Sequence, residues 1–400
     1  MSESKYLFIR RDEKILSFLM QGQKAIEIHC DDSSADSLLG NIYIGKIKNI
    51  AKNIGAAFVE IAPGQVCYLP LEDMKAPVYT KKGSSRQPQA GDELLVQVSR
   101  DAIKTKAPAV TTKLTLHGKY VLLTVGDARR SVSSKLGSKK REQLLELLER
   151  IPESKNAEYP EYGWLLRTNA GDAEETLLAK DICRLRNQFE ALMQQARYRT
   201  CFSCLIRTPS VYLTRLSNLY QSDAEQILTD DEGLYREISE YLTLNQPEDL
   251  PRLSLYRNEL LPVHKLYSLE HQLAQALQEK VWLNSGGYLV IQPTEALTVI
   301  DVNTGKYEGG KKKEAAFLKI NQEAAVEIAR QIRLRNLSGI IIVDFINMES
   351  EESITTLLSV LRERLQRDPI PTVLVDMTKL SLVEITRKKV EKPLSECCRM

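Results

Sequence analysis

Two stretches of the sequence contain an apolar run followed directly by an aspartate: LTVIDVNTG at residues 297–305, with Asp301, and IIIVDF at residues 340–345, with Asp344. Between them, residues 313–334 carry apolar side chains at helical spacing, and a second such segment precedes a third apolar run, TVLVDM, at residues 372–377. This alternation of strands and helices predicts a largely parallel sheet, covered by helices, in the C-terminal third of the chain.

Asp301 and Asp344 lie at the carboxyl ends of two of these predicted strands, where α/β sheets bind their ligands. Two carboxylates from separate strands can share one Mg²⁺, which prefers oxygen ligands and keeps several waters. Asn303 follows Asp301 by two residues, so on a strand it points to the same side and is placed to orient a ligand. The alternative, that each aspartate caps the turn or helix after it, stays open.

The composition is that of an ordinary folded protein. With 400 residues, of which 43% are hydrophobic and 27% charged, the chain is long enough for two to four domains. We find no apolar run of about 18 residues and no secretory signal, so no membrane span is expected. The formal charge is only +2, and nucleic-acid binding would therefore need local basic patches.

Short β runs broken by glycines fill residues 42–70, and this spacing predicts a small barrel. Phe58 and Tyr68 lie on its strands, and Lys106 follows them. Exposed aromatic side chains on small barrels stack on single-stranded bases. The alternative, that both rings belong to the barrel core, also stays open.

Basic residues also gather near the two aspartates. Arg333 and Arg335 lie at the end of the predicted helix, and three lysines precede it at residues 311–313. They could neutralise a phosphate backbone, although each run taken alone is typical of a solvated face. Arg167 and Thr168 stand at a strand end, and both side chains can bind phosphate.

The cysteines and histidines predict little chemistry. Seven cysteines, an odd number, indicate free thiols in a reducing cytoplasm and not a disulfide framework. The four histidines show no metal-ligand spacing, and no Ser/His/Asp or Walker-type motif is present.

Three segments occur in an order that resembles the catalytic region of the ribonuclease E/G family of bacterial endoribonucleases: ALTVIDVNTGKYEGG, EIARQIRLRNLSGIIIVDFINM and LVEITRKK. Upstream, NIYIGKIKNI, GAAFVEI and YLPL resemble the S1 RNA-binding barrel of that family, and LLRTNAG resembles its 5′-end sensor. The resemblance therefore covers most of the chain.

The resemblance implies an α/β multidomain fold. An RNase H-like subdomain is interrupted by an S1 (OB-type) barrel and a 5′-sensor region, and a DNase I-like α/β catalytic subdomain follows. The expected order is a first RNase H-like segment (residues 1–36), the S1 barrel (37–116), the 5′-sensor region (117–199), a second RNase H-like segment (200–272), the catalytic subdomain (273–395) and an incomplete zinc-link remnant (396–400).

The implied activity is Mg²⁺-dependent cleavage of single-stranded, A/U-rich RNA in ribosomal RNA processing or messenger decay. The products carry a 5′-phosphate and a 3′-hydroxyl, and 5′-monophosphorylated RNA is preferred. By the resemblance, Asp301 and Asp344 hold the metal with support from Asn303, and Arg167 and Thr168 grip the 5′-phosphate. The residues expected to contact RNA are Phe58, Tyr68, Lys106, Arg333 and Arg335.

The sequence departs from the family pattern in three places. Asn347 stands where a second aspartate is frequent, and Tyr68 replaces the usual Phe. The family's C-x-x-C segment, in which two protomers share a zinc ion, is not completed, and Cys398 is only a candidate for its first half. A homodimer, zinc binding and Mn²⁺ in place of Mg²⁺ therefore stay open. The alternative function is a non-catalytic protein that binds single-stranded RNA.

Overall fold

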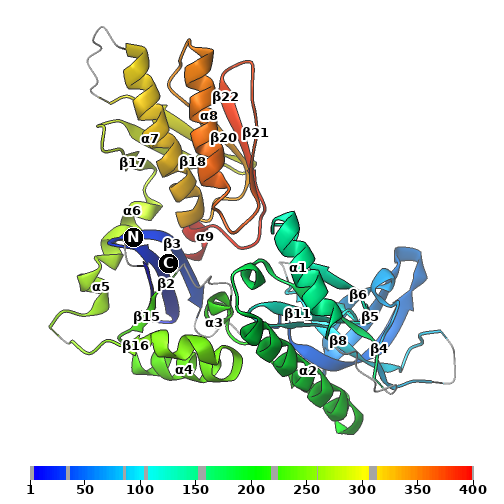
Figure 1. The fold of residues 1–400 in the computed structure, drawn as a ribbon. Coiled ribbons are helices and arrows are strands. Elements are labelled where there is room, and N and C mark those ends of the chain that lie inside the picture. The colour runs from blue at the N-terminus through cyan, green and yellow to red at the C-terminus, as the bar shows by residue number, and fades with distance from the viewer. Residues whose placement is uncertain are drawn as a thin grey trace. The chain divides into compact units, whose positions relative to one another are not determined.

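The computed structural model describes residues 4–32, 37–83, 87–102, 107–151, 159–217, 224–258, 260–305 and 313–398. The chain divides into two compact units (Figure 1). Unit 1 comprises residues 1–34, 221–240 and 249–400, and unit 2 comprises residues 35–220 and 241–248. Within the described ranges, no helix has the length and apolar character needed to cross a membrane.

A closed five-stranded barrel lies within unit 2, as predicted. Its strands pair in a ring in the order β4, β5, β6, β9 and β8, and pairing between β4 and β8 closes the ring. Alternate residues such as Val59, Cys67 and Val96 fill the interior because successive side chains point to opposite faces. The strands of this sheet are β4 (Ile42–Ala51), β5 (Ala56–Ala62), β6 (Gln65–Pro70), β7 (Tyr79–Lys81), β8 (Glu93–Arg100), β9 (Ala109–Thr111) and β14 (Cys204–Ile206).

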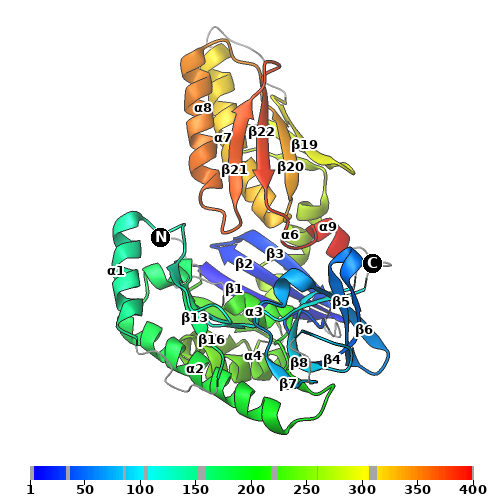
Figure 2. The ribbon, with the colours of Figure 1, turned by 90° about the vertical axis from the view of Figure 1, so that its right-hand side faces the viewer.

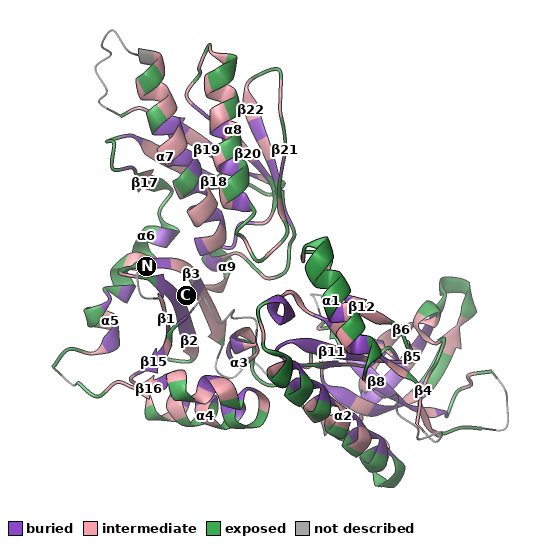
Figure 3. Ribbon diagram, viewed as in Figure 1, coloured by how far each residue is buried: buried purple, intermediate pink, exposed green. Residues whose placement is uncertain are grey.

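The rest of unit 2 is a four-stranded sheet with helices. The long helix α2 (Glu175–Tyr198) was predicted from its apolar spacing, and it buries Leu178, Leu185 and Phe189 in the same core as Trp164. Its other side is exposed (Figure 3). The remaining elements are β10 (Thr115–His117), β11 (Val121–Val125), β12 (Arg130–Val132), α1 (Ser138–Glu149), β13 (Tyr162–Leu166) and α3 (Val211–Leu216).

A five-stranded sheet in unit 1 is assembled from two separated pieces of the chain. Its three N-terminal strands are antiparallel, and β15 joins β1 in parallel, with Lys5 opposite Gln226. Leu269, Leu273 and Leu394 from helices cover one face. The elements are β1 (Ser4–Arg11), β2 (Lys14–Gln21), β3 (Lys24–Asp32), β15 (Gln226–Thr229), α4 (Glu232–Asn245), β16 (Leu253–Leu255), α5 (Val263–Leu266), α6 (Leu269–Leu277) and α9 (Leu394–Cys397).

The second sheet of unit 1 has six strands in the order β17, β18, β19, β20, β22 and β21. Helices α7 and α8 lie on one face (Figure 2) and bury Ile328 and Leu361 against Ile300 and Ile341. The elements are β17 (Lys280–Trp282), β18 (Tyr288–Pro293), β19 (Leu297–Asn303), α7 (Lys313–Leu334), β20 (Gly339–Asp344), α8 (Glu351–Leu365), β21 (Thr372–Met377) and β22 (Leu382–Arg387).

The prediction that this sheet is largely parallel was wrong. In the described residues, only β19 and β20 pair in parallel, and the other four pairings are antiparallel. Short turns join β18 to β19 and β21 to β22, and a short turn can only connect antiparallel neighbours. Because α7 and α8 share one face, none of the described helices of this subdomain covers the other, which we call the open face.

Candidate active site

Asp301 and Asp344 are direct neighbours on the open face. The register of the parallel strands β19 and β20 sets these two residues opposite each other. Along β19, Ile300 and Val302 are buried under the helices, so Asp301 between them points to the open face. The sequence pattern of an apolar run ending in aspartate therefore places both carboxylates side by side, as predicted from the strand ends.

Within the ranges that the structure describes, neither aspartate caps a helix. Asp301 lies inside β19, which continues to Asn303, and α8 is capped by Ser350, whose side chain accepts a hydrogen bond from the Ser353 amide. Asp344 is exposed at the end of β20. The described residues therefore give no support to helix capping by either aspartate.

Asn303 orients the first carboxylate. Its side-chain Nδ2 donates a hydrogen bond to Oδ2 of Asp301 over 2.7 Å. Among the described residues, no Lys or Arg forms a salt bridge with Asp301 or Asp344. Like charges directly opposite each other on a sheet are destabilising, and a divalent cation between them removes the repulsion. One or two carboxylates with open solvent positions are the usual protein contribution to a Mg²⁺ site, so these residues fit that ion.

Two further acids share this face. Glu384 of β22 is register-paired with Asp376 of β21 and with Ile342 of β20, two residues before Asp344. Our sequence reasoning missed both, although TVLVDM repeats the signal of an apolar run that ends in an acid. Within the described residues, no group of three or more His, Cys, Asp or Glu side chains is arranged to hold a metal, so the candidate site rests on two carboxylates.

On the barrel, Phe58 and Tyr68 form an aromatic pair. They face each other on β5 and β6, with ring centroids 6.4 Å apart and ring planes at 80°. Both are half-buried, whereas their neighbours Val59 and Cys67 fill the interior, so the two rings lie on the outer face. The core alternative is therefore removed. Lys106 lies outside the described residues.

Arg167 and Thr168 stand where β13 ends and a short 3₁₀ helix (Thr168–Gly171) begins. The hydroxyl groups of Thr168 and Ser133 are 2.9 Å apart. The pKa of His117 lies below its usual range because burial disfavours its charged form and the positive charge of Arg167 opposes protonation. The guanidinium Nη1 of Arg167 donates to three carbonyl oxygens, those of Gly118, Lys119 and Ser217.

The model of the ribonuclease E/G family matches residues 115–390. The chain belongs to the ribonuclease E/G family. Ribonuclease G of Escherichia coli K12 is 30% identical over 381 residues, which cover 92% of this chain and 76% of that protein. Ribonuclease E of Nostoc is 32% identical over 359 residues, or 88% of this chain and 51% of that protein. These relatives are endoribonucleases, and the predicted resemblance is confirmed.

Two other predicted RNA contacts, which come from the basic run at the end of α7, are engaged elsewhere. Arg333 donates from Nε to Glu27 of β3. Burial would raise the pKa of Glu27, but hydrogen bonding to His29 and the charge of Arg333 outweigh it and lower the pKa to about 2. The structure does not bring Arg333 onto the open face, because α7 covers the opposite one. Its contact with RNA stays a prediction.

Arg335 is only 7% exposed, and its Nε donates to Oε1 of Gln331 over 2.6 Å. Burial, with a smaller contribution from the charge of Arg330, lowers the pKa of Arg335 to about 10. This burial leaves little of the Arg335 side chain accessible to a ligand. The contact of Arg335 with RNA stays a prediction.

Cys398, the candidate for the family's zinc link, follows α9 and packs with Cys30 of β3 against the same apolar core. Hydrogen bonding between the two thiols lowers the pKa of Cys30 and raises that of Cys398. No described cluster around them has the three or more ligands that a zinc ion needs. Zinc binding stays a prediction.

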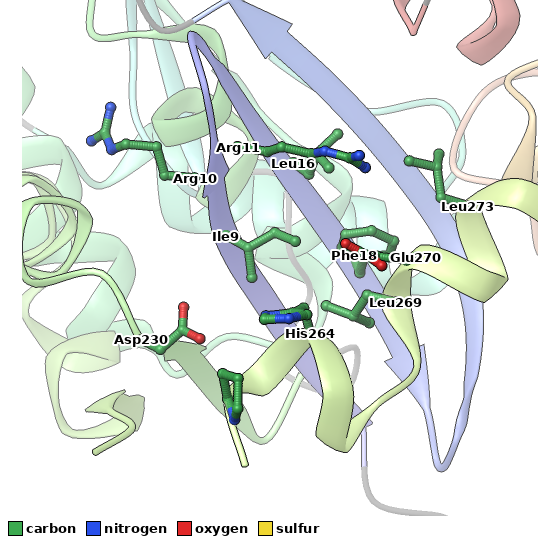
Figure 4. Close-up of a pocket in the computed structure, with 11 residues that line it drawn as sticks. Ile9, Arg10, Arg11, Leu16, Phe18, Asp230, His264, Leu269, Glu270 and Leu273 are labelled. Atoms are coloured by element: carbon green, nitrogen blue, oxygen red, sulfur yellow. The ribbon is translucent and has the colours of Figure 1, made fainter. Parts of the chain in front are cut away.

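A separate hollow in unit 1 contains none of the predicted site residues. Figure 4 shows Leu269, Glu270 and Leu273 of α6 on one side, opposite Leu16 and Phe18 of β2. Its lining combines apolar side chains with charged ones, including Arg11, Asp230 and Glu270.

Proposed function

We propose that this ribonuclease E/G family member is a Mg²⁺-dependent endoribonuclease that cleaves single-stranded, A/U-rich RNA in the cytoplasm. The products carry a 5′-phosphate and a 3′-hydroxyl. One observation carries the proposal: Asp301 and Asp344 are register-paired on the open face of a sheet, and no described cation neutralises them. A binding protein has no need of two converging carboxylates.

The residues of the site divide the work. Asp301 and Asp344 would hold the ion, which when bound supplies electrostatic stabilisation of the charge that gathers on the phosphodiester. Asn303 holds the Asp301 carboxylate in one rotation through its 2.7 Å hydrogen bond. Hydrolysis by water needs no ribose hydroxyl and no histidine pair.

The barrel supplies a grip on the substrate. Phe58 and Tyr68 present two rings on its outer face, and stacking of a base on an aromatic ring contributes about 1–3 kcal/mol. We place Lys106 beside them on the resemblance alone. This division, binding on the barrel and cleavage on the six-stranded sheet, would let the enzyme hold a strand while cutting it.

The expected domain boundaries also belong to this proposal. The five-stranded sheet is assembled from residues 4–32 and 226–255, as an RNase H-like subdomain split by an insertion requires. We assign the six-stranded sheet with α7 and α8 to the expected DNase I-like catalytic subdomain.

The first test is cleavage of a short A/U-rich single-stranded RNA by Asp301→Asn. This variant keeps the shape of the side chain and removes one of the two charges. We expect at least a 100-fold loss of kcat, because roughly several kcal/mol of charge stabilisation is lost. RNA affinity in EDTA should be unchanged.

Asn347→Ala is the matched control. Asn347 is an exposed residue shortly after Asp344, and we expect this variant to cleave RNA at the wild-type rate. Cleavage by Asp301→Asn at the wild-type rate would refute the assignment. RNA binding by the wild-type chain without cleavage, with Mg²⁺ or Mn²⁺, would favour the alternative of a non-catalytic RNA-binding protein.

We further propose that Arg167 and Thr168 recognise a 5′-monophosphate. The proposal is supported by their adjacent positions at the start of one 3₁₀ helix and by the affinity of guanidinium and hydroxyl groups for phosphate. Thr168→Val removes the hydroxyl at nearly constant volume. We expect it to reduce the preference for 5′-monophosphorylated over 5′-hydroxyl RNA, while cleavage of 5′-hydroxyl RNA is unchanged. An equal fall on both substrates would instead indicate a structural role.

A further inference from the structure

Three side chains that the proposed mechanism does not use lie beside the carboxylate pair. Trp282 of β17 is register-paired with Tyr288 of β18, and Tyr288 is register-paired with Asn303 of β19. Asn303 is the residue that holds Asp301 by its side-chain hydrogen bond. Trp282, Tyr288 and Asn303 therefore form one row of register-paired residues across β17, β18 and β19.

The third side chain belongs to the row of the carboxylates themselves. Lys280 pairs with Val290, and Val290 pairs with Asp301. Residues that are register-paired, or two apart on one strand, point to the same face, so the lysine, both aromatic rings and both carboxylates share the open face. Tyr288 is a diagonal neighbour of Asp301, a separation of about 7–8 Å that aromatic side chains can span.

The exposure of Trp282 is unusual for this chain. Its exposed fraction is 64%, whereas Trp164, the second tryptophan of the sequence, is 3% exposed in the core of unit 2. A large apolar ring left in water forgoes the free energy of burial and commonly marks a surface that binds a ligand. The rings of Trp282 and Tyr288 are 5.3 Å apart at 61°, a compact pair.

Lys280 adds a positive charge to this pair. Its Nζ lies 4.2 Å from the centroid of the Trp282 ring and 3.6 Å from that of Tyr288. The cation is thus held over the rings and, within the described residues, forms no salt bridge with an acid. Two rings with a cation between them match the chemistry of a nucleotide, which has a flat base and a charged phosphate.

We propose that Trp282, Tyr288 and Lys280 form a nucleotide platform, on which one base of the RNA next to the cleaved bond stacks while Lys280 faces its phosphate. The inference rests on the proposed function, because it takes the carboxylate pair as the cleavage site. Continuity with that pair favours RNA over a protein partner, since an RNA strand that crosses the carboxylates toward β17 passes the platform.

The platform can be tested without catalysis. Trp282 is the exposed one of the two tryptophans, so stacking of a base should quench its fluorescence when single-stranded RNA is added in EDTA. We expect quenching in the wild type and in Asp301→Asn, and its loss in Trp282→Phe. An unchanged spectrum at saturating RNA would overturn the platform.

Cleavage gives the second readout. Trp282→Ala should lower kcat/KM by about 10-fold through loss of one stacked base, and Trp282→Tyr should restore most of it. A substrate series with single abasic nucleotides should show one sensitive position in the wild type and none in Trp282→Ala. Tyr198→Ala, which removes an aromatic ring that is 86% exposed on α2, is the control expected to behave as wild type.

The two proposals fail in different ways. If RNA quenches the fluorescence of the wild-type chain but is not cleaved, the proposed nuclease function is refuted and the proposed binding of a base at the platform is supported. Normal cleavage by Trp282→Ala, with no position sensitive to base removal, would refute the platform and keep the nuclease. The exposed tryptophan would then point to a protein partner.

Discussion

Asp301 reaches the open face through the two-residue repeat of β19, and Asn303 repeats its direction one step later. The result is a carboxylate whose rotation is set by a neighbour on its own strand. Such partners of metal ligands matter because they fix the ligand before the metal arrives.

Asn303→Ala tests this positioning role. Without the hydrogen bond, the Asp301 carboxylate can rotate, so we expect kcat to fall by about 10- to 100-fold and the Mg²⁺ concentration needed for half-maximal rate to rise. Cleavage rates measured over a Mg²⁺ titration would check this. A fall in kcat with an unchanged Mg²⁺ requirement would contradict a role through the metal ligand.

At this scale, the sequence predicts the direction of side chains that follow a local repeat. It does not predict the position of a side chain that is held by a partner far away in the chain. Strand alternation was enough to place Asp301 and Asn303, whereas it put Phe58 on a strand without deciding between the core and the outer face. Arg333 could not be placed, because its partner Glu27 lies 306 residues earlier in the chain. Trp282 was not singled out, since its importance follows from the pairing of three strands.

At the scale of elements, the six-stranded sheet is held at its far end by a buried ion pair. Arg387 of β22 donates from Nε to Oδ2 of Asp368 over 2.7 Å, and from Nη1 to Asn336 and to the carbonyl of Leu337. One side chain thus ties β22 to the turn after α7 and to the loop after α8. The segment LVEITRKK was noted only for its resemblance, and this role was not foreseen.

Arg387→Met should destabilise unit 1 by about 3–5 kcal/mol, because it leaves Asp368 charged and buried without its partner. Urea unfolding of the variant and the wild type would measure the difference. Arg367→Ala is the matched control: Arg367 pairs with Glu363 at the surface, with side chains 62% and 61% exposed, so its loss should cost at most about 1 kcal/mol. Equal costs for both variants would contradict the argument.

Elements were predicted more easily than their pairing. The apolar pattern was enough to foresee α7, α8 and the strands β18 to β21, but not β22, which lies between β20 and β21. The direction of a strand depends on which edges of the sheet are already paired with other strands. The sequence of one strand does not contain that information. The wrong prediction of a largely parallel sheet also meant that the open face was not foreseen, because a parallel sheet is expected to be covered by helices on both sides.

At the scale of the whole molecule, metal binding should stabilise only the unit that contains the carboxylate pair. A ligand that binds only the folded state, at ten times its dissociation constant, adds about 1.4 kcal/mol to the free energy of unfolding. We therefore expect Mg²⁺ to raise the melting temperature of unit 1 and not that of unit 2. Differential scanning calorimetry with Mg²⁺ or EDTA would show this.

Asp301→Asn is the control for that measurement, and its melting temperature should not respond to Mg²⁺. A shift of equal size in the variant would mean that the ion binds elsewhere. The expected order of domains stays a prediction, and no sequence pattern indicated that residues 241–248 return to unit 2. Those few residues follow tertiary contacts that no local pattern reveals.

The parallel pairing of β1 with β15 has a consequence for the order of events in time. During synthesis, β1 leaves the ribosome early, and Gln226 follows only after the whole of residues 37–217. At about 5–20 residues per second, this takes roughly 10–40 s. The barrel can close in that interval while one edge of β1 waits unpaired and open to aggregation. The length of the insertion therefore sets how long the nascent chain needs protection from aggregation through the unpaired edge of β1.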